Sequence, residues 1–176
     1  MSTKAERERL KKDEDMKGVV NFLKNSGEYF YWFIPGNVPS SKNNKVPMPI
    51  YVGSRGTKQR RIISCSVQNS DSTKKYATEK KELYHKFGCE FRELFNEQKQ
   101  LKIGFFFINK TRAQFDYINK AQMVQDMMVK HGWISDDNAD VMRPIFPEIN
   151  GHIYLSDSKY CGVIILIKKE LCHENA

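Results

Sequence analysis

The sequence has no apolar run that approaches the eighteen or so residues of a membrane-spanning helix. Met1 to Asp15 is charged throughout and has no apolar core of the kind found in a secretory signal. We therefore expect a cytoplasmic protein that has no membrane partner.

Paired metal-binding cysteines are also missing. The four cysteines, Cys65, Cys89, Cys161 and Cys172, are widely spaced, with no CxxC pair and no cluster with the four histidines. Structural zinc sites depend on such close spacing. We expect the cysteines to be reduced core thiols and the histidines to be structural or exposed.

The positive charge of the sequence is concentrated in one segment. Of the formal net charge of +8, residues 42–86 contribute eleven basic and three acidic side chains, while the two flanking segments are close to neutral. Such concentration favours a polyanion, because each neutralised phosphate releases condensed counterions. The alternative is a lysine-rich surface that only keeps the protein soluble.

The length of 176 residues suits one domain. We expect a charged, helical extension over residues 1–27, docked only where it becomes apolar near Val19 to Leu23. The domain proper should span residues 28–170, followed by a tail at 171–176.

Within that domain, apolar runs and turn residues predict six strands and two main helices. The strands are Glu28 to Ile34, Ile50 to Val52, Arg61 to Val67, Leu101 to Ile108, Val141 to Phe146 and Tyr160 to Lys168. The helices start at Asp71 or Ser72 and at Asp116, and end near Asn96 and His131; Asn37 to Pro49 reads as a loop. The fold class is therefore α/β (α+β), with a small mixed sheet packed by two helices.

The second helix has two distinct faces. Tyr117, Ala121, Val124 and Met128 fall within an arc of about 60° and should face the core. Asp116, Asn119, Asp126 and Lys130 form a polar face, with Asp116 at the N-cap and Gly132 after the last turn.

A run of oxygen donors follows this helix, at Asp136, Asp137, Asn138 and Asp140. Mg²⁺ and Mn²⁺ prefer such ligands, often one or two carboxylates together with water and substrate phosphate. The alternative interpretation is an ordinary turn, which the same residue types favour.

Three segments together resemble the RusA-type Holliday-junction resolvases and their phage relatives. These are FIPGNVPSSKNNK (Phe33 to Lys45), FDYINKAQMVQDMMVKHGWISDDN (Phe115 to Asn138) and the closing strand YCGVIILI. The resemblance implies a small α/β homodimer in a bacterium or phage-infected cell, which cuts four-way DNA junctions with Mg²⁺, clustered aspartates and a lysine.

The family pattern is Asp-x-Asp-Asn-x-x-Lys at the helix start and Asp-Asp after the helix. In this chain Asp116 matches its first aspartate, Asn119 its asparagine, and Asp137 its second motif. Ile118 stands where the second aspartate belongs and Gln122 where the lysine belongs. Either other oxygen donors complete the site, or the protein binds junctions and cuts them poorly.

The distance along the helix is a further problem. A helix from Asp116 to His131 is about 22 Å long, and Asp137 lies beyond its far end. Either the following loop turns back, or a partner's helix lies antiparallel and brings its own Asp137 to Asp116.

We therefore expect a Mg²⁺-dependent endonuclease (Mn²⁺ as the alternative metal) that resolves four-way junctions in DNA recombination and repair. The alternatives are a non-catalytic protein that binds branched DNA, and a flap or fork nuclease with the same site; no small-molecule cofactor is expected. The principal ligands are Asp116 and Asp137, the secondary ones Asp136, Asn119 and Asp140, and Lys120 is the candidate transition-state cation. The expected DNA contacts are Lys42, Asn43, Lys45, Arg55, Lys58, Arg60, Arg61, Lys74 and Lys75.

Overall fold

The computed structural model describes residues 4–40, 45–52, 61–95 and 100–169. A mixed sheet has the strand order β1-β7-β4-β5. The short strand β6 pairs with the end of β4, whereas β5 pairs with its beginning. Strand β7 is antiparallel to β1 and β4, whereas β5 and β6 run parallel to β4. The strands are β1 (Tyr29–Pro35), β4 (Leu101–Asn109), β5 (Met142–Ile145), β6 (Tyr154–Ser156) and β7 (Gly162–Lys168). The predicted mixed sheet is confirmed.

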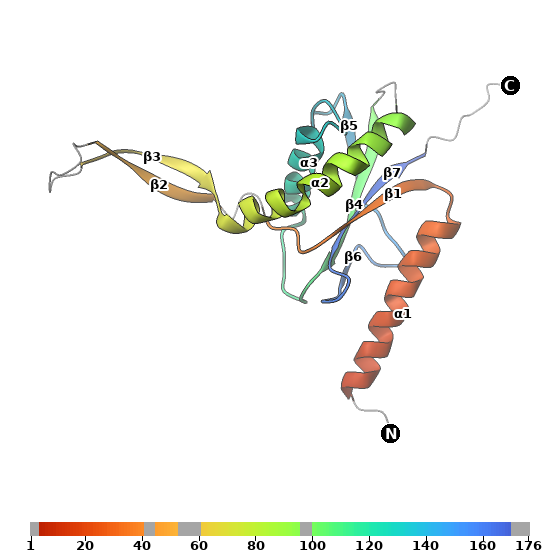
Figure 1. Ribbon diagram of the computed structural model, residues 1–176. Helices are drawn as coiled ribbons and strands as arrows, with labels where there is room; N and C mark the ends of the chain where they lie inside the picture. The colour runs from red at the N-terminus through yellow and green to blue at the C-terminus, as the bar shows by residue number, and fades with distance from the viewer. Residues whose placement is uncertain (1–3, 41–44, 53–60, 96–99, 170–176) are drawn as a thin grey trace.

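Helices cover both faces of this sheet (Figure 1). Because side chains alternate along a strand, Ile103, Phe105 and Phe107 of β4 lie in a core shared with α2 (Asp71–Leu94) and α3 (Tyr117–Lys130). Phe106 and Ile108 point to the other face, toward α1 (Lys4–Asn25). The fold is therefore a single α+β domain with three helices rather than two.

Helix α1 docks through its second half, as predicted. Val19 and Leu23 are buried against Phe106, and Met16 and Phe22 are partly buried beside them. This helix supplies the cover for one face of the sheet, so it belongs to the core and is more than the appendage that its charge suggested.

Strands β2 (Lys45–Val52) and β3 (Arg61–Asn69) form a separate two-stranded ribbon that projects away from the body (Figure 1). The prediction of a loop from Asn37 to Pro49 is wrong from Lys45 onward, because Pro47 and Pro49 are part of β2. Proline lacks a backbone donor and is tolerated where the nitrogen faces away from the partner strand. Two prolines at alternate positions point their nitrogens to the same side, which fits a two-stranded ribbon.

The helix ends follow their capping residues. Ser70 caps α2 by accepting a hydrogen bond from the backbone N–H of Thr73 at 3.3 Å, so the cap lies one residue before the predicted Asp71. Asp116 caps α3, as predicted. Gly132 follows that helix with a φ of 69°, a left-handed conformation that favours glycine.

Other expectations differ in detail. Strand β5 is shorter than the predicted Val141 to Phe146, and the three-residue β6 was not predicted at all. Cys89 and Cys161 are free and half-buried. In the described ranges of the chain, no helix is long and apolar enough to cross a membrane.

Candidate functional site

The ends of β1 and β4 and the start of β7 lie together at one end of the sheet. The end of β1 lies beside the start of β7, since Pro35 pairs with Gly162, and the end of β4 lies on the other side of it, since Ile108 also pairs with Gly162. This topology brings the residues that follow each strand together. Asn37 comes just after β1, and Asn109 is the last residue of β4.

The side chain of Lys120 reaches this end of the sheet from the first turn of α3. It is only 8% exposed, and its Nζ donates to Oδ1 of Asn109 at 2.7 Å and to Oδ1 of Asn37 at 3.4 Å. The ammonium group also lies 4.9 Å from the centre of the Phe115 ring. Burial lowers the pKa of Lys120, and Cys161 partly opposes that shift. A buried cation is therefore held here by neutral oxygens and an aromatic ring.

Asn109 is the residue on which this arrangement depends. It is 5% exposed, and its Nδ2 is buried without a hydrogen-bond partner among the described residues. Its backbone oxygen accepts a 2.8 Å hydrogen bond from the N–H of Asp157, so β6 and the following turn hold the strand end. A buried amide donor without a partner is costly, and such groups are often found at sites that receive a ligand.

Asp116 caps α3 four residues before Lys120, and its backbone oxygen accepts from the Lys120 N–H at 3.2 Å. Its carboxylate accepts from the backbone N–H of Asn119 at 3.1 Å and from Nδ2 of the same residue at 2.8 Å. Asp116 itself is exposed, and a carboxylate has about four lone-pair positions, so it retains acceptor capacity. Asn119 was expected on a polar face, but it is 6% exposed. Its side chain is turned toward Asp116, and this contact explains the burial.

The acidic run after α3 lies at the opposite end of β4. Leu101 begins that strand and donates its N–H to the backbone oxygen of Val141 at 2.9 Å, whereas Asn109 ends it at Lys120. Figure 1 likewise shows the loop after α3 at the other end of the helix from its start. The loop therefore does not turn back to bring Asp137 to Asp116 within one chain. The second arrangement, a partner's antiparallel helix, stays a prediction.

The acidic run itself forms a compact turn. Asp136 accepts from the backbone N–H of Asp137 and from Nδ2 of Asn138, both at 2.8 Å. Asn138 in turn accepts from the N–H of Asp140 at 3.0 Å, and all four residues are exposed. These contacts are those of an ordinary turn, and they leave the Asp137 side chain exposed for a partner.

The predicted DNA contacts divide into three groups. Lys74 and Lys75 are exposed on the first turn of α2, and Lys75 forms an exposed ion pair with Glu79 at 3.8 Å. Lys45 and Arg61 are the first residues of the two ribbon strands. The others, Lys42, Asn43, Arg55, Lys58 and Arg60, lie outside the described residues.

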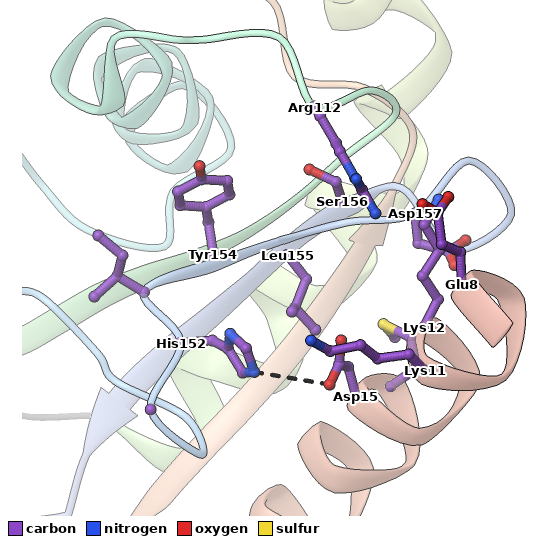
Figure 2. Close-up of a pocket in the computed structure, with 13 residues that line it drawn as sticks. Glu8, Lys11, Lys12, Asp15, Arg112, His152, Tyr154, Leu155, Ser156 and Asp157 are labelled. Carbon is purple, nitrogen blue, oxygen red and sulfur yellow. Dashed lines mark ion pairs between the residues drawn. The ribbon is translucent and has the colours of Figure 1, made fainter. Parts of the chain in front are cut away.

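A cleft of about 460 Å³ lies next to the site, between α1 and β6 (Figure 2). Lys11 and Lys12 extend from α1, and Arg112 comes from the loop that follows β4. On its floor His152 lies 3.8 Å from the carboxylate of Asp15. The cleft carries both signs of charge, so it is a continuation of the surface around the site rather than a purely basic pocket.

Sequence reasoning missed two members of the site. Asn109 was expected only as the first residue of a loop, and Asn37 only as one polar residue of another. A polar residue at or just after the end of an almost wholly apolar strand was the available signal. The topology brings Asn37 and Asn109 together.

The metal-binding side chains of the described residues lie apart from one another. In this part of the chain, no three His, Cys, Asp or Glu side chains come together as a ligand group. Asp116 supplies one carboxylate at the start of α3, and the buried amide nitrogen of Asn109 is a donor that repels a cation. A divalent ion bound at Asp116 would take further ligands from another carboxylate, from water or from a substrate phosphate.

Comparison with known proteins adds no relative. No protein-family model matches the chain, and no curated protein matches its sequence significantly. The function must therefore be argued from the site itself.

Proposed function

We propose that this protein is a metal-dependent endonuclease for branched DNA, of the Holliday-junction resolvase type, that works as a homodimer. The observation that carries the proposal is the buried ammonium group of Lys120, which Asn109 and Asn37 hold in place. Lys120 lies in the first turn of α3, four residues after the N-cap Asp116. A lysine and a carboxylate at one helix start are the groups that the resemblance requires.

The chemistry of phosphodiester cleavage fits a fixed cation. Negative charge develops on the phosphate oxygens, and a preorganised donor in a site of low polarity stabilises that charge more than water does. The ammonium of Lys120 has three N–H donors, of which two point to the asparagine oxygens. The third is suited to a phosphate oxygen that enters beside Asp116. A bound Mg²⁺ would supply further charge neutralisation and an activated water.

The position of Lys120 also supports a different alignment of the family pattern. When Asp-x-Asp-Asn-x-x-Lys is set two residues earlier, its lysine falls on Lys120 and its second aspartate on Asp116. Gln114 then stands at the first aspartate and Tyr117 at the asparagine. This alignment keeps Asp116 and Lys120 as matched residues, whereas the first alignment placed the family's lysine position at Gln122.

The proposed dimer would supply a second carboxylate. The exposed Asp137 lies at the far end of β4 in its own chain, so a partner in antiparallel orientation is what would bring a second acidic residue to Asp116. A two-fold axis then gives two equivalent sites, which suits the nicking of two strands in a four-way junction. The projecting ribbon and the lysines of α2 are the proposed contacts to the DNA backbone.

The experiment is a nicking assay on a labelled four-way junction, with Mg²⁺, with Mn²⁺, and with a chelator. We expect metal-dependent nicks in the parent protein, none in Asp116→Asn or Lys120→Met, and a retarded junction band in all three. Retardation without nicks under either metal would leave the non-catalytic binding protein as the function. Faster cutting of flap or fork substrates in competition would make the protein a flap or fork nuclease.

A further inference from the structure

A row of aromatic rings borders the candidate site on the face of β4 that α3 covers. Neighbouring ring centres are 5.1 Å apart for Tyr154 and Phe115, and 5.9 Å apart for Phe115 and Phe107. They are 5.1 Å apart for Phe107 and Tyr117, and 5.2 Å apart for Tyr117 and Phe146. We call these five residues the aromatic row.

The two ends of the row face solvent. Phe107 in the middle is 1% exposed, whereas Phe146 is 66% exposed and Tyr154 is 42% exposed. Ile118 and Ile153, next to the row, are 56% and 60% exposed. A single exposed apolar side chain is normal for a surface, but several that adjoin one another mark a binding site. The buried middle fixes the exposed ends in place.

The row adjoins the residues of the proposed site. The Lys120 ammonium lies over Phe115, and Asp116 sits in the chain between Phe115 and Tyr117. The Tyr117 hydroxyl donates a 2.6 Å hydrogen bond to the backbone oxygen of Phe105, which anchors the first turn of α3 to β4. The row therefore adjoins the helix start that carries Asp116 and Lys120.

Charge indicates the kind of ligand. The loop that leads from β4 to Phe115 carries Lys110 and Arg112, both exposed, and the chain has a net charge of +8. Figure 2 shows Arg112 near Ser156, while Tyr154 points to the opposite side of β6 from α1. Exposed cations beside aromatic rings favour a polyanion such as the DNA backbone.

We propose that the aromatic row binds unpaired nucleobases of DNA, by stacking them on Phe146 and Tyr154 while Lys110 and Arg112 contact the adjoining phosphates. This inference rests on the proposed function and specifies its substrate as branched DNA with unpaired bases next to the cut. Bases inside a duplex are stacked on one another, so their faces are available only in single strands, at ends and at branch points.

The test measures binding of a fluorescein-labelled oligo-dT strand and of a duplex of the same length by anisotropy, without divalent metal. Phe146→Ala and Tyr154→Ala should each lower the affinity for oligo-dT by about five- to one-hundred-fold, since each removes one stacking partner. Affinity for the duplex should change little, and Phe146→Trp should retain the affinity for oligo-dT. Tyr31→Ala is the matched control, because this tyrosine is 41% exposed on β1, at the other edge of the sheet.

Two results would overturn the inference. One is unchanged affinity for oligo-dT in both alanine variants. The other is a loss of affinity that accompanies a change in oligomeric state by light scattering, because the row would then be an interface between copies of the chain. Failure of the nuclease proposal looks different: the alanine variants lose oligo-dT binding as expected, while the parent protein nicks no branched substrate with any metal.

Discussion

The Nζ of Lys120 lies 2.7 Å from Oδ1 of Asn109, so the first turn of α3 is tied to the last residue of β4. The lysine has no ion pair within the described ranges of the chain. Its ammonium group contacts side-chain oxygens and lies near the rings of Phe115 and Phe107, in a place where 8% of the residue is exposed. Such a group costs folding free energy when it is charged, which indicates a role beyond stability.

That cost predicts how stability depends on pH. The folded-state pKa of Lys120 is below its ordinary value of 10.5, so between these two values the unfolded chain binds more protons than the folded one. Stability therefore rises with pH across this window, and below the folded-state pKa the full cost of the buried charge remains. We expect the stability of the parent protein to rise relative to Lys120→Met as the pH rises toward 10.5.

The measurement is urea unfolding of both proteins at a series of pH values, with the difference in unfolding free energy as the readout. Tyrosines and other lysines titrate in both proteins, so their contributions cancel in the difference. Lys120→Arg is the matched control, because arginine stays charged throughout and should show no such rise against Lys120→Met. A difference that is flat with pH would contradict the burial of the charge.

A second prediction concerns the division of the site between subunits. If Asp116 of one chain works with Asp137 of its partner, a mixture of Asp116→Asn and Asp137→Asn chains forms heterodimers in which one site is wholly intact. Each variant should be inactive by itself, and the mixture should recover up to about a quarter of the parent activity by the random pairing of two chain types. Asparagine caps a helix as well as aspartate does, so Asp116→Asn should fold normally.

The readout is junction nicking after the two variants are unfolded and refolded together. The control is the same mixture of Asp116→Asn with Lys120→Met, two residues at the same helix start, which should not complement. Full activity of Asp137→Asn by itself would place Asp137 outside the site. Inactive single variants without recovery in the test mixture would contradict a site shared between subunits.

A third prediction concerns the basic ribbon. Arg60→Ala together with Arg61→Ala should lower junction affinity and reduce the slope of log affinity against log salt by up to roughly two units. Removal of the same charge at Lys24 and Lys168, which are exposed at the end of the sheet away from the site, is the control. An unchanged slope in the ribbon variant would mean that the DNA binds elsewhere.

A fourth prediction tests the packing that positions α3. A Cβ at Gly88 would lie 2.8 Å from Cδ1 of Trp133 and 2.9 Å from the backbone oxygen of His131. Alanine normally stabilises a helix by about 1 kcal/mol relative to glycine. Here we expect Gly88→Ala to destabilise the protein by about 1–3 kcal/mol, because α2 must move away from the turn after α3. Denaturant unfolding measures the change, and a gain in stability would show that the contact relaxes freely.

The regular elements of the central sheet were predictable because their signals are local. The apolar run from Leu101 and the helical seam of Ala121, Val124 and Met128 follow from periodicity, and the structure confirms both. Strand β6 was not predictable, since its three residues pair through the backbone with β4 and carry no pattern of their own. The same limit applies to the prolines of β2, which read locally as a loop.

The candidate site was predictable only in part. Asp116 and Lys120 became candidates through the resemblance to the resolvase family, and helix position gave the N-cap role of Asp116. The burial of Lys120 and its contacts with Asn37 and Asn109 depend on residues 83 and 11 positions away in the sequence. No local pattern reports such a contact. The separation of Asp137 from Asp116 likewise follows from the direction of β4, which spacing on one helix does not determine.

The docking of α1 changes where a minimal folding unit must begin. A fragment that starts at Glu28 would lack Val19 and Leu23, and the Phe106 and Ile108 face of the sheet would be left open to water. Such a fragment would tend to aggregate, even though it keeps every residue assigned to the site. Truncations for crystallisation or fusion should therefore retain the chain from before Met16.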